Sequence, residues 1–343
     1  MPSTALPQCV GIFERWGQPD SPRFPSSRPE KLHSEPPVPA CVQIVFLGTS
    51  GSWPTPKRNV SAIAVKRGPE VILFDCGEGT QRQFMLSKLS FMQVSRVFLT
   101  HFHGDHFLGL PGMVQSMSMN GRERELLVYG PKGTEGLVEN LVTLGHFRSA
   151  FPVVGKGLRG GEAVDCGEYA VRAVESAHTV PALGYALEEG PRPGRFSLER
   201  ARELGVPEGP LYSRLQEGQA VTVGGRTIAP KMVLGPPRRG RKIVYTGDTL
   251  PTRSILEAAR DADVLIHDAT ADTGLEEKAN RYGHSTGRQA AEIAKEAGAR
   301  ALILTHYSPR YEDATPILED AKAVFPATYM AEDFFEYEVP YPD

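Results

Sequence analysis

The sequence predicts a mixed α/β protein with two β-sheets, and three features of its pattern support this fold class. Short apolar runs of strand length recur from residue 41 to residue 308. The early runs follow one another closely, whereas later runs alternate with helical patterns, which favours two sheets over one singly wound parallel sheet. Apolar residues make up 40% of the chain and charged residues 23%, as is typical of globular proteins.

The expected strands and helices follow one another in a clear order. The first strand lies within residues 41–51 (CVQIVFLGTSG) and ends in a Gly-Ser turn. The later apolar runs, each expected to form a strand, are 61–66, 71–79, 95–101, 126–131, 169–178, 183–189, 242–249, 264–270 and 301–308. Apolar residues at helical spacing predict helices at 254–262 and 286–298.

Length and composition exclude several classes of protein. At 343 residues the chain can bury an ample core. No apolar run approaches the ~20 residues that span a bilayer, and the N-terminus lacks the pattern of a secretory signal. Four scattered cysteines without a CxxC pair indicate reduced thiols, so we expect a cytoplasmic protein. A net charge of −3 argues against a uniformly basic surface but allows a local basic patch.

Residues 1–40 differ in composition from the rest of the chain. They hold nine of the 29 prolines and show no apolar periodicity, so they cannot bury enough surface to offset the entropy of ordering. We therefore expect a disordered, Pro-rich leader at 1–40 and a folded domain at 41–343. An alternative is that the protein starts near Cys41 and that the leader reflects a mis-called start site.

Side chains that bind metals gather at the ends of the predicted strands. Strand ends that share one sheet edge can hold side chains rigidly around one point. A single histidine at a strand end is ordinarily a surface residue with its hydrogen bonds made. Six Asp or His residues, each at the end of an apolar run, are not explained in this way and predict a metal site. The Asp and His residues that end an apolar run are Asp75, His101, His178, Asp248, His267 and His306.

The stretch FLTHFHGDHFLGLPG holds the densest cluster of such residues. His101 and His103 can face one ion as the chain leaves its strand, and Asp105 and His106 can serve a second ion. Imidazole nitrogen and carboxylate oxygen suit zinc, with manganese or iron as alternatives. Two ions about 3.5–4 Å apart need a bridging ligand, which Asp248 can supply. Because zinc lowers the pKa of bound water to about 7, the pattern predicts a dinuclear hydrolase.

The motif THFHGDH, preceded by FDCGEG and followed by distant His178, Asp248 and His306, resembles the metallo-β-lactamase superfamily. The resemblance implies an αββα sandwich with a dinuclear metal site on its rim. It implies that Asp105 also holds or deprotonates the attacking water, and that Asp75 orients a ligand histidine by a hydrogen bond. The implied ligands are His101, His103 and His178 on one zinc, His106, His306 and Asp105 on the other, and Asp248 bridging the two.

Further motifs resemble one family within that superfamily. HFHGDHFLGLPG, LLVYGPKG, IVYTGDT, IHDAT, YGHST and LILTHYSPRY are similar to segments of the ribonuclease Z family, and the similarity runs from about residue 42 to the C-terminus. This resemblance implies an endonuclease that trims the 3′ end of precursor tRNA. Two positions depart from the family's usual pattern, because Asp268 stands where glutamate is common and Ala186 where arginine is common.

The segment from residue 191 to residue 242 is strongly basic. It holds eleven Lys or Arg against four Glu, a net charge of +7 in a chain of −3. Basic side chains can follow the backbone of a folded RNA, whereas cleavage of a small metabolite needs no such insertion. Residues 191–240 resemble the exosite arm of the ribonuclease Z family, with its Gly-Pro portion at Gly209 and Pro210. The resemblance implies a clamp on the tRNA elbow and a homodimer; a solvated charged loop is the alternative.

Two other motifs bear on specificity and catalysis. PTPKRN, with Lys57 and Arg58, resembles the loop with which the family senses bases after the cleavage site. A plain basic turn is the alternative. His267 and His284 match family positions linked to departure of the ribose 3′ oxygen, where a histidine can act as general acid.

We therefore predict a zinc-dependent endoribonuclease that cleaves precursor tRNA after the discriminator base, leaving a tRNA 3′-hydroxyl and a 5′-phosphorylated trailer. The expected cofactors are two Zn²⁺ ions per subunit, with Mn²⁺ as an in vitro alternative. The expected partners are precursor tRNA and a second copy of the chain, with neither a membrane nor DNA. Two alternatives stay open, namely a small-molecule phosphodiesterase or hydrolase of the same fold and a non-catalytic RNA-binding relative.

Overall fold

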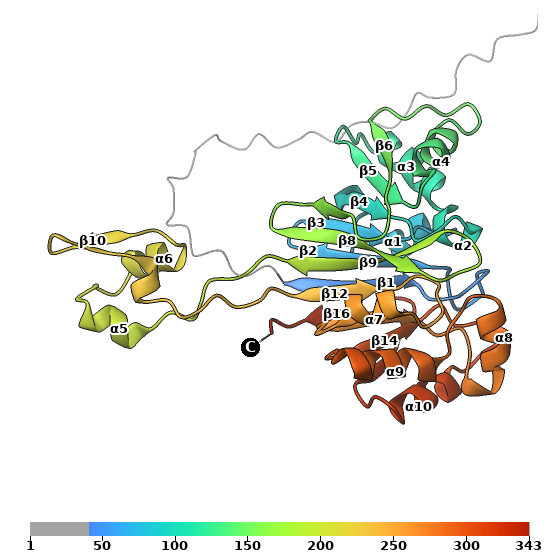
Figure 1. Ribbon diagram of the computed structural model, residues 1–343. Helices are drawn as coiled ribbons and strands as arrows, with labels where there is room; N and C mark the ends of the chain where they lie inside the picture. Colours follow the sequence, from blue (N-terminus) through green and yellow to red (C-terminus); the bar gives the residue numbers. More distant parts are fainter. Residues whose placement is uncertain (1–40, 343) are drawn as a thin grey trace, which may run out of the picture. The chain divides into compact units, whose positions relative to one another are not determined.

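The computed structural model describes residues 41–342, so the leader expected at residues 1–40 lies outside the described part of the chain. The described residues form two seven-stranded sheets and a separate two-stranded ribbon (Figure 1). The two predicted sheets are thus confirmed. Within residues 41–342 no helix is both long and apolar enough to cross a lipid bilayer.

The first sheet has the strand order β16-β1-β2-β3-β4-β5-β6. Strands β3 to β6 run parallel to one another, so their carboxyl ends share one edge of the sheet. The bounds are β1 (Val42–Gly48), β2 (Ala62–Arg67), β3 (Glu70–Phe74), β4 (Val94–Phe98), β5 (Leu126–Gly130), β6 (Val153–Gly157) and β16 (Glu336–Val339).

The second sheet has the order β15-β14-β13-β12-β9-β8-β7. Strands β12 to β15 are parallel, whereas β7, β8, β9 and β12 pair antiparallel. The bounds are β7 (Ala163–Asp165), β8 (Tyr169–Ser176), β9 (Ala182–Glu189), β12 (Lys242–Tyr245), β13 (Val264–Asp268), β14 (Leu302–Thr305) and β15 (Thr328–Met330).

The sheets pack face to face between two layers of helices, which gives the expected αββα sandwich (Figure 1). Strand β1 shows why its residues are apolar on both faces. Ile44 and Phe46 lie in the core between the sheets, while Val45 and Leu47 lie in the core under the helices. The helices that contribute to the outer cores are α1 (Thr80–Leu86), α3 (Leu110–Met119), α4 (Thr134–Val142), α7 (Arg253–Ala259), α9 (Gly287–Ala297) and α10 (Thr315–Lys322).

Helix α9 matches its sequence prediction closely. Thr286 and Gln289 form a capping box at its start, and Gly298 ends it with a φ of 67°. Short helices connect the remaining strands without adding a layer. They are η1 (Phe91–Gln93), α2 (Gly104–Phe107), η3 (Thr273–Leu275) and α8 (Glu276–Arg281).

The chain between β9 and β12 forms a separate small unit of structure. Residues 192–197 and 233–238 run antiparallel as a two-chain stalk, bridged at Arg192–Arg238 and at Phe196–Leu234. Residues 198–232, the lobe, have their own apolar core of Ala201, Val206, Leu215, Val221 and Ile228, which Val233 completes. The lobe contains α5 (Leu198–Glu203), α6 (Pro210–Gln216), β10 (Val221–Val223), β11 (Arg226–Ile228) and η2 (Pro230–Met232).

Candidate metal centre

Three histidines from both sheets direct ring nitrogens at one point. His101 follows β4, His103 precedes α2, and His178 follows β8. Nε2 of His101 lies 3.0 Å from Nδ1 of His103, and Nε2 of His178 lies 3.3 Å from the same atom. Ligand atoms at 2.0–2.1 Å around a tetrahedral ion lie about 3.4 Å apart. The three nitrogens are therefore spaced to hold one ion.

A second group lies beside the first. Asp105 and His106 come from α2, and His306 follows β14. Oδ2 of Asp105 is 3.5 Å from Nε2 of His106 and 3.4 Å from Nε2 of His306. These separations also suit ligands of one ion, so the turn after β4 contributes to both groups.

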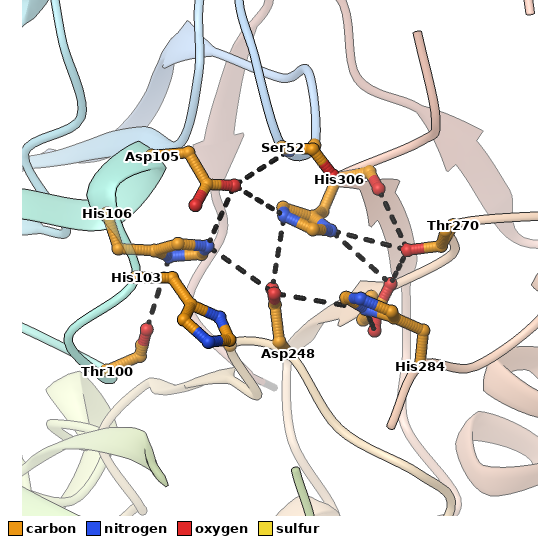
Figure 2. Close-up of polar contacts among 12 residues, drawn as sticks. Ser52, Thr100, His103, Asp105, His106, Asp248, Thr270, His284 and His306 are labelled. Atoms are coloured by element: carbon orange, nitrogen blue, oxygen red, sulfur yellow. Dashed lines mark hydrogen bonds and ion pairs between the residues drawn. The ribbon is translucent and has the colours of Figure 1, made fainter. Parts of the chain in front are cut away.

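Asp248 lies between the two groups (Figure 2). It follows β12, and its Oδ2 is 3.7 Å from Nε2 of His101 and 3.5 Å from Nε2 of His106. Its Oδ1 is 3.3 Å from Nε2 of His306. One carboxylate thus contacts histidines of both groups, which is the position of a bridging ligand.

Two buried polar atoms at this centre lack a hydrogen-bond partner among the described residues. They are Nε2 of His106 and Oδ1 of Asp248. Leaving a buried polar atom unpaired costs about 1–3 kcal/mol, so native proteins rarely retain one without a function. Both atoms face the common centre of the ligand groups. The residues present therefore fit a pair of metal ions.

The buried carboxylates at this centre require positive charge. Burial would lower the pKa of both His106 and His306, but Asp248 and the neighbouring carboxylates raise it above the usual range, so a metal ion would replace the protons on these two rings. Burial, together with the neighbouring charge of His106, lowers the pKa of His101 well below its usual range, so this ring is neutral and able to bind a metal. Burial would raise the pKa of Asp248, but His306 and His106 hold it well below its usual value. An ionised carboxylate in a buried pocket requires positive charge beside it.

Hydrogen bonds from outside the centre orient its ligands. Nδ1 of His106 donates to Oδ2 of Asp75 at 2.8 Å, which leaves Nε2 facing the centre. Asp75 is held in turn by the backbone N–H of Thr100 at 2.7 Å and the hydroxyl of Tyr245 at 2.8 Å. Nδ1 of His178 donates to the carbonyl oxygen of Gly283 at 2.9 Å. Asp75 thus orients His106 by a hydrogen bond, the contact expected of it from the family resemblance.

Ser52 holds Asp105 in place, a role that no motif in the sequence predicts. The backbone N–H of Ser52 donates to Oδ2 of Asp105 at 2.7 Å (Figure 2). Ser52 has a φ of 65°, a left-handed conformation that is uncommon for a serine and that aims its N–H at the carboxylate. The only signal in the sequence is the Gly-Ser turn that follows β1.

His284 and Asp268 form a pair at the margin of the centre. Nδ1 of His284 donates to Oδ2 of Asp268 at 2.9 Å, and its ring stacks on His306 with centroids 5.3 Å apart. Burial would lower the pKa of His284, but the charge of Asp268 and the hydrogen bond to it raise that pKa above its usual value. The structure thus gives Asp268 a direct role beside His284, although it was not among the predicted site residues.

His267 does not reach this cluster. Its ring is fully buried in β13, and its Nδ1 donates to the backbone carbonyl of Asp268 at 2.8 Å. Its Nε2 has no hydrogen-bond partner among residues 41–342. Of the two histidines expected to aid departure of the 3′ oxygen, only His284 lies among the ligand groups.

The two predicted basic residues of the PTPKRN segment differ in their surroundings. Lys57 is exposed, whereas Arg58 donates to the carbonyl oxygens of Tyr307 and Tyr311 at 2.9 and 3.1 Å. The guanidinium of Arg58 also lies 3.8 Å above the ring of Tyr307. Residues 53–58 and 308–312 line a groove of about 500 Å³. Arg58 therefore anchors one wall of this groove to the other.

Gly209 and Pro210 lie away from the metal centre, at the start of α6 in the lobe. Both residues are exposed, and Gly209 has a φ of 127°, which favours glycine at this position.

Comparison with known proteins places the chain in a family. A β-lactamase superfamily domain model matches residues 226–307, and a model of the anti-Pycsar protein Apyc1 matches residues 42–146. Ribonuclease Z of Methanosarcina acetivorans is 51% identical over 301 residues, which cover 88% of this chain and 99% of that protein. The chain belongs to the ribonuclease Z family. Ribonuclease Z of Archaeoglobus fulgidus is 48% identical, over 87% of this chain and 97% of that protein.

Solved structures agree with this assignment. The short form of human tRNase Z superposes with a TM-score of 0.63 at 28% identity, over 87% of this chain and 99% of that one. The metallo-β-lactamase fold protein YhfI from Bacillus subtilis has the same fold, with a TM-score of 0.63 at 19% identity over 87% of this chain. The expected endoribonuclease of the ribonuclease Z family, in the metallo-β-lactamase superfamily, is confirmed.

Proposed function

We propose that this ribonuclease Z family member removes the 3′ trailer of precursor tRNA with two zinc ions bound at the centre described above. Cleavage after the discriminator base leaves a 3′-hydroxyl on the tRNA and a 5′-phosphate on the trailer. The observation that carries the proposal is the place of Asp248 between two ligand groups in a chain of this family. Five imidazoles and two carboxylates form a nitrogen-rich ligand set that favours zinc, and manganese can bind the same donors.

The ligand assignment follows the observed distances. His101, His103 and His178 would hold one ion, and Asp105, His106 and His306 the other, with Asp248 shared. When bound, the two ions would stabilise charge on the scissile phosphate and lower the pKa of an attacking water. Asp75 keeps Nε2 of His106 in the ligand position throughout.

Asp105 and His284 are suited to move protons on opposite sides of the reaction. Asp105, fixed by the N–H of Ser52, orients the water and accepts its proton as the water oxygen bonds to phosphorus. His284, whose pKa Asp268 raises, donates a proton to the ribose 3′ oxygen as its bond to phosphorus breaks. We assign no part in this step to His267, whose fully buried ring belongs to none of the candidate ligand groups.

We propose that the stalk and lobe are the exosite arm and grip the tRNA elbow, with Gly209 and Pro210 at the start of α6 as part of the contact. Fewer positive charges on the arm are available to contact RNA than the net charge of +7 for residues 191–242 implies. Residues 193–237 hold six Lys or Arg and four Glu, a net charge of +2. The rest of the basic charge lies where the stalk meets the sheet, and there Arg239 pairs with Asp263 at 2.8 Å.

The groove beside the metal centre is proposed to take the first bases of the trailer. Lys57 is exposed on its rim and can contact a phosphate, whereas the donors of Arg58 already bind Tyr307 and Tyr311. Arg58 would therefore act on specificity only by holding the groove open.

A homodimer and a cytoplasmic location complete the proposal. Met85, Leu86 and Leu108 are apolar yet exposed by 71%, 56% and 49%, and Met85 and Leu108 line the same surface hollow. Such an apolar patch suits contact with a second copy of the chain. Sedimentation of the wild type and of a Met85→Glu/Leu108→Glu variant tests this, since the variant should sediment as a monomer.

Cleavage of a precursor tRNA with a 3′ trailer is the deciding assay. The metallated protein should release a 5′-phosphorylated trailer, chelation should abolish the activity, and zinc or manganese should restore it. Asp105→Ala should stop turnover while tRNA affinity stays nearly unchanged. Absence of cleavage by a folded, metal-loaded sample would reject the proposal. Replacing residues 198–232 by a short turn should spare hydrolysis of bis(p-nitrophenyl) phosphate and abolish cleavage of precursor tRNA. This pair of results separates a tRNA nuclease from a small-molecule phosphodiesterase.

A further inference from the structure

Tyr341, near the C-terminus, lies at the base of the stalk, against Arg192 at the start of the stalk and Arg241 directly before β12. The guanidinium carbon of Arg192, on the outgoing chain, lies 3.7 Å from the centroid of its ring. That of Arg241, on the returning chain, lies 3.9 Å from the same centroid. A cation this close to an aromatic ring centroid is attracted by the ring, and arginine stacks there readily. One aromatic ring therefore contacts a residue from each side of the insertion.

Backbone contacts of the same tail add to this arrangement. Arg192 donates from Nη2 to the carbonyl oxygen of Pro342 at 2.8 Å, and from Nε to that of Arg239 at 3.2 Å. Arg241 donates from Nη1 to the carbonyl oxygen of Val339, at the end of β16, at 3.4 Å. The tail is thus tied both to the stalk and to the first sheet.

A buried ion pair fixes the returning chain beneath the ring. Arg241 donates from Nε and Nη2 to the two oxygens of Glu189 at 2.7 and 2.9 Å, and both side chains are almost fully buried. Arg67 donates to the same carboxylate at 3.1 Å. Burial would raise the pKa of Glu189, but the hydrogen bonds and charge of Arg241 lower it, so the carboxylate is ionised. Arg241 is therefore a rigid support for Tyr341.

The stalk itself is a narrow connection. Its two chains are bridged at two positions, and a side chain at Gly194 would collide with the backbone of Gly235, which shows how closely they run. The lobe has its own core, so its internal structure does not depend on the sheets. The base of the stalk therefore sets the direction of the lobe, because a small rotation there displaces the distant lobe by a larger distance.

We propose that Tyr341 is a positioning residue that orients the lobe for RNA by clamping Arg192 and Arg241. The proposal rests on the proposed function of the lobe as the site that grips tRNA. The clamp acts on substrate binding and leaves the metal centre unchanged, because Tyr341 is in contact with the base of the stalk and not with the ligands.

Steady-state kinetics on the metallated full-length protein test this clamp. Tyr341→Ala should raise KM for precursor tRNA by about 10-fold, as expected for the loss of two cation–π contacts, with kcat and hydrolysis of bis(p-nitrophenyl) phosphate unchanged. Tyr341→Phe keeps the ring and should restore the wild-type KM. Tyr329→Ala is the matched control, since this exposed tyrosine packs on Tyr337 and should leave KM unchanged.

Hydrogen exchange gives a second readout at the amides of Arg192 and Arg238, which bond to each other's carbonyl oxygens across the stalk at 2.7 and 3.0 Å. Both amides should exchange faster in Tyr341→Ala than in wild type. An unchanged KM in Tyr341→Ala, or a KM that Tyr341→Phe fails to restore, would overturn the clamp. If replacing the lobe itself leaves KM unchanged, the proposed role of the lobe in RNA binding fails instead.

Discussion

The carboxylate of Asp75 accepts a hydrogen bond from Nδ1 of His106 at 2.8 Å, and the hydroxyl of Tyr245 donates to the same oxygen. Asp75 directly follows β3 in the first sheet, and Tyr245 is the last residue of β12 in the second. The orientation of one metal-facing ring therefore depends on contacts from both sheets.

Asp75→Asn should weaken metal binding at the second ligand group by about 10–100-fold, the usual cost of losing a partner that orients a ligand histidine. Asn is a suitable replacement because it tolerates the left-handed φ of 57° at this position. A chelator competition titration measures the change. Tyr245→Phe, which removes only the supporting hydroxyl, should show a smaller loss, and equal losses in the two variants would contradict this ranking.

His284→Gln should lower kcat for precursor tRNA by about 10²–10⁴-fold, the range for loss of a general acid. Adding Asp268→Asn to His284→Gln should lower kcat little further, because the two residues act as a unit. Metal content, measured in parallel, should stay at the wild-type value. His267→Gln is the contrasting variant, and it should lower the unfolding free energy by about 1–3 kcal/mol while sparing kcat. A loss of kcat as large as that of His284→Gln would return His267 to the catalytic step.

The stability of the protein should depend on pH through Glu189. The pKa of Glu189 is lower in the folded than in the unfolded state. Its contribution to the free energy of unfolding is therefore fully present above the unfolded pKa of about 4.3, and it is lost as the pH falls through the folded pKa. Glu189→Gln should cost about 3 kcal/mol at neutral pH because it leaves the Arg241 charge buried with a weaker partner. Urea unfolding at a series of pH values should show this difference shrinking towards acid, and a constant difference would argue against an ionic origin.

Binding of precursor tRNA should weaken with salt, by a log–log slope of about 0.9 for each duplex phosphate contact. Arg226 is exposed on β11. Arg226→Ala should reduce the slope by about 0.9, the value for one phosphate contact. Arg239→Ala should leave the slope unchanged, since Asp263 already neutralises this arginine through two hydrogen bonds. Filter binding between 50 and about 200 mM salt gives both slopes, and equal effects of the two variants would contradict the charge assignment.

Patterns local in the sequence predicted the fold, and together with the family resemblance they named the ligands expected at the candidate metal centre. Apolar runs located the strands because side chains on both faces are buried, and apolar residues at helical spacing located α9. The expected ligands could be named because each follows a strand or lies in one compact motif. Their convergence on one centre was an inference, which the distances around Asp248 support, but the ligands come from strand ends of both sheets and not from one sheet edge.

Contacts between distant segments could not be predicted in the same way. Arg58 reads as a free basic residue, yet it binds a carbonyl oxygen 249 positions away at Tyr307. His267 ends an apolar run as a ligand would, but its ring is fully buried and its Nδ1 donates to the carbonyl oxygen of Asp268. Nor does the count of basic residues in the insertion reveal that Arg239 is neutralised by Asp263.

The division of the ligands between the two sheets has a consequence for the life of the protein in a cell. His101, His103, Asp105 and His106 belong to the N-terminal half, and His178, Asp248 and His306 to the other, so neither half has a complete coordination shell. Each bound ion would link the two sheets, and its binding free energy would add to the free energy of unfolding. Scarcity of metal would then remove this enzyme through proteolysis of the loosened apo form as well as through inactivity.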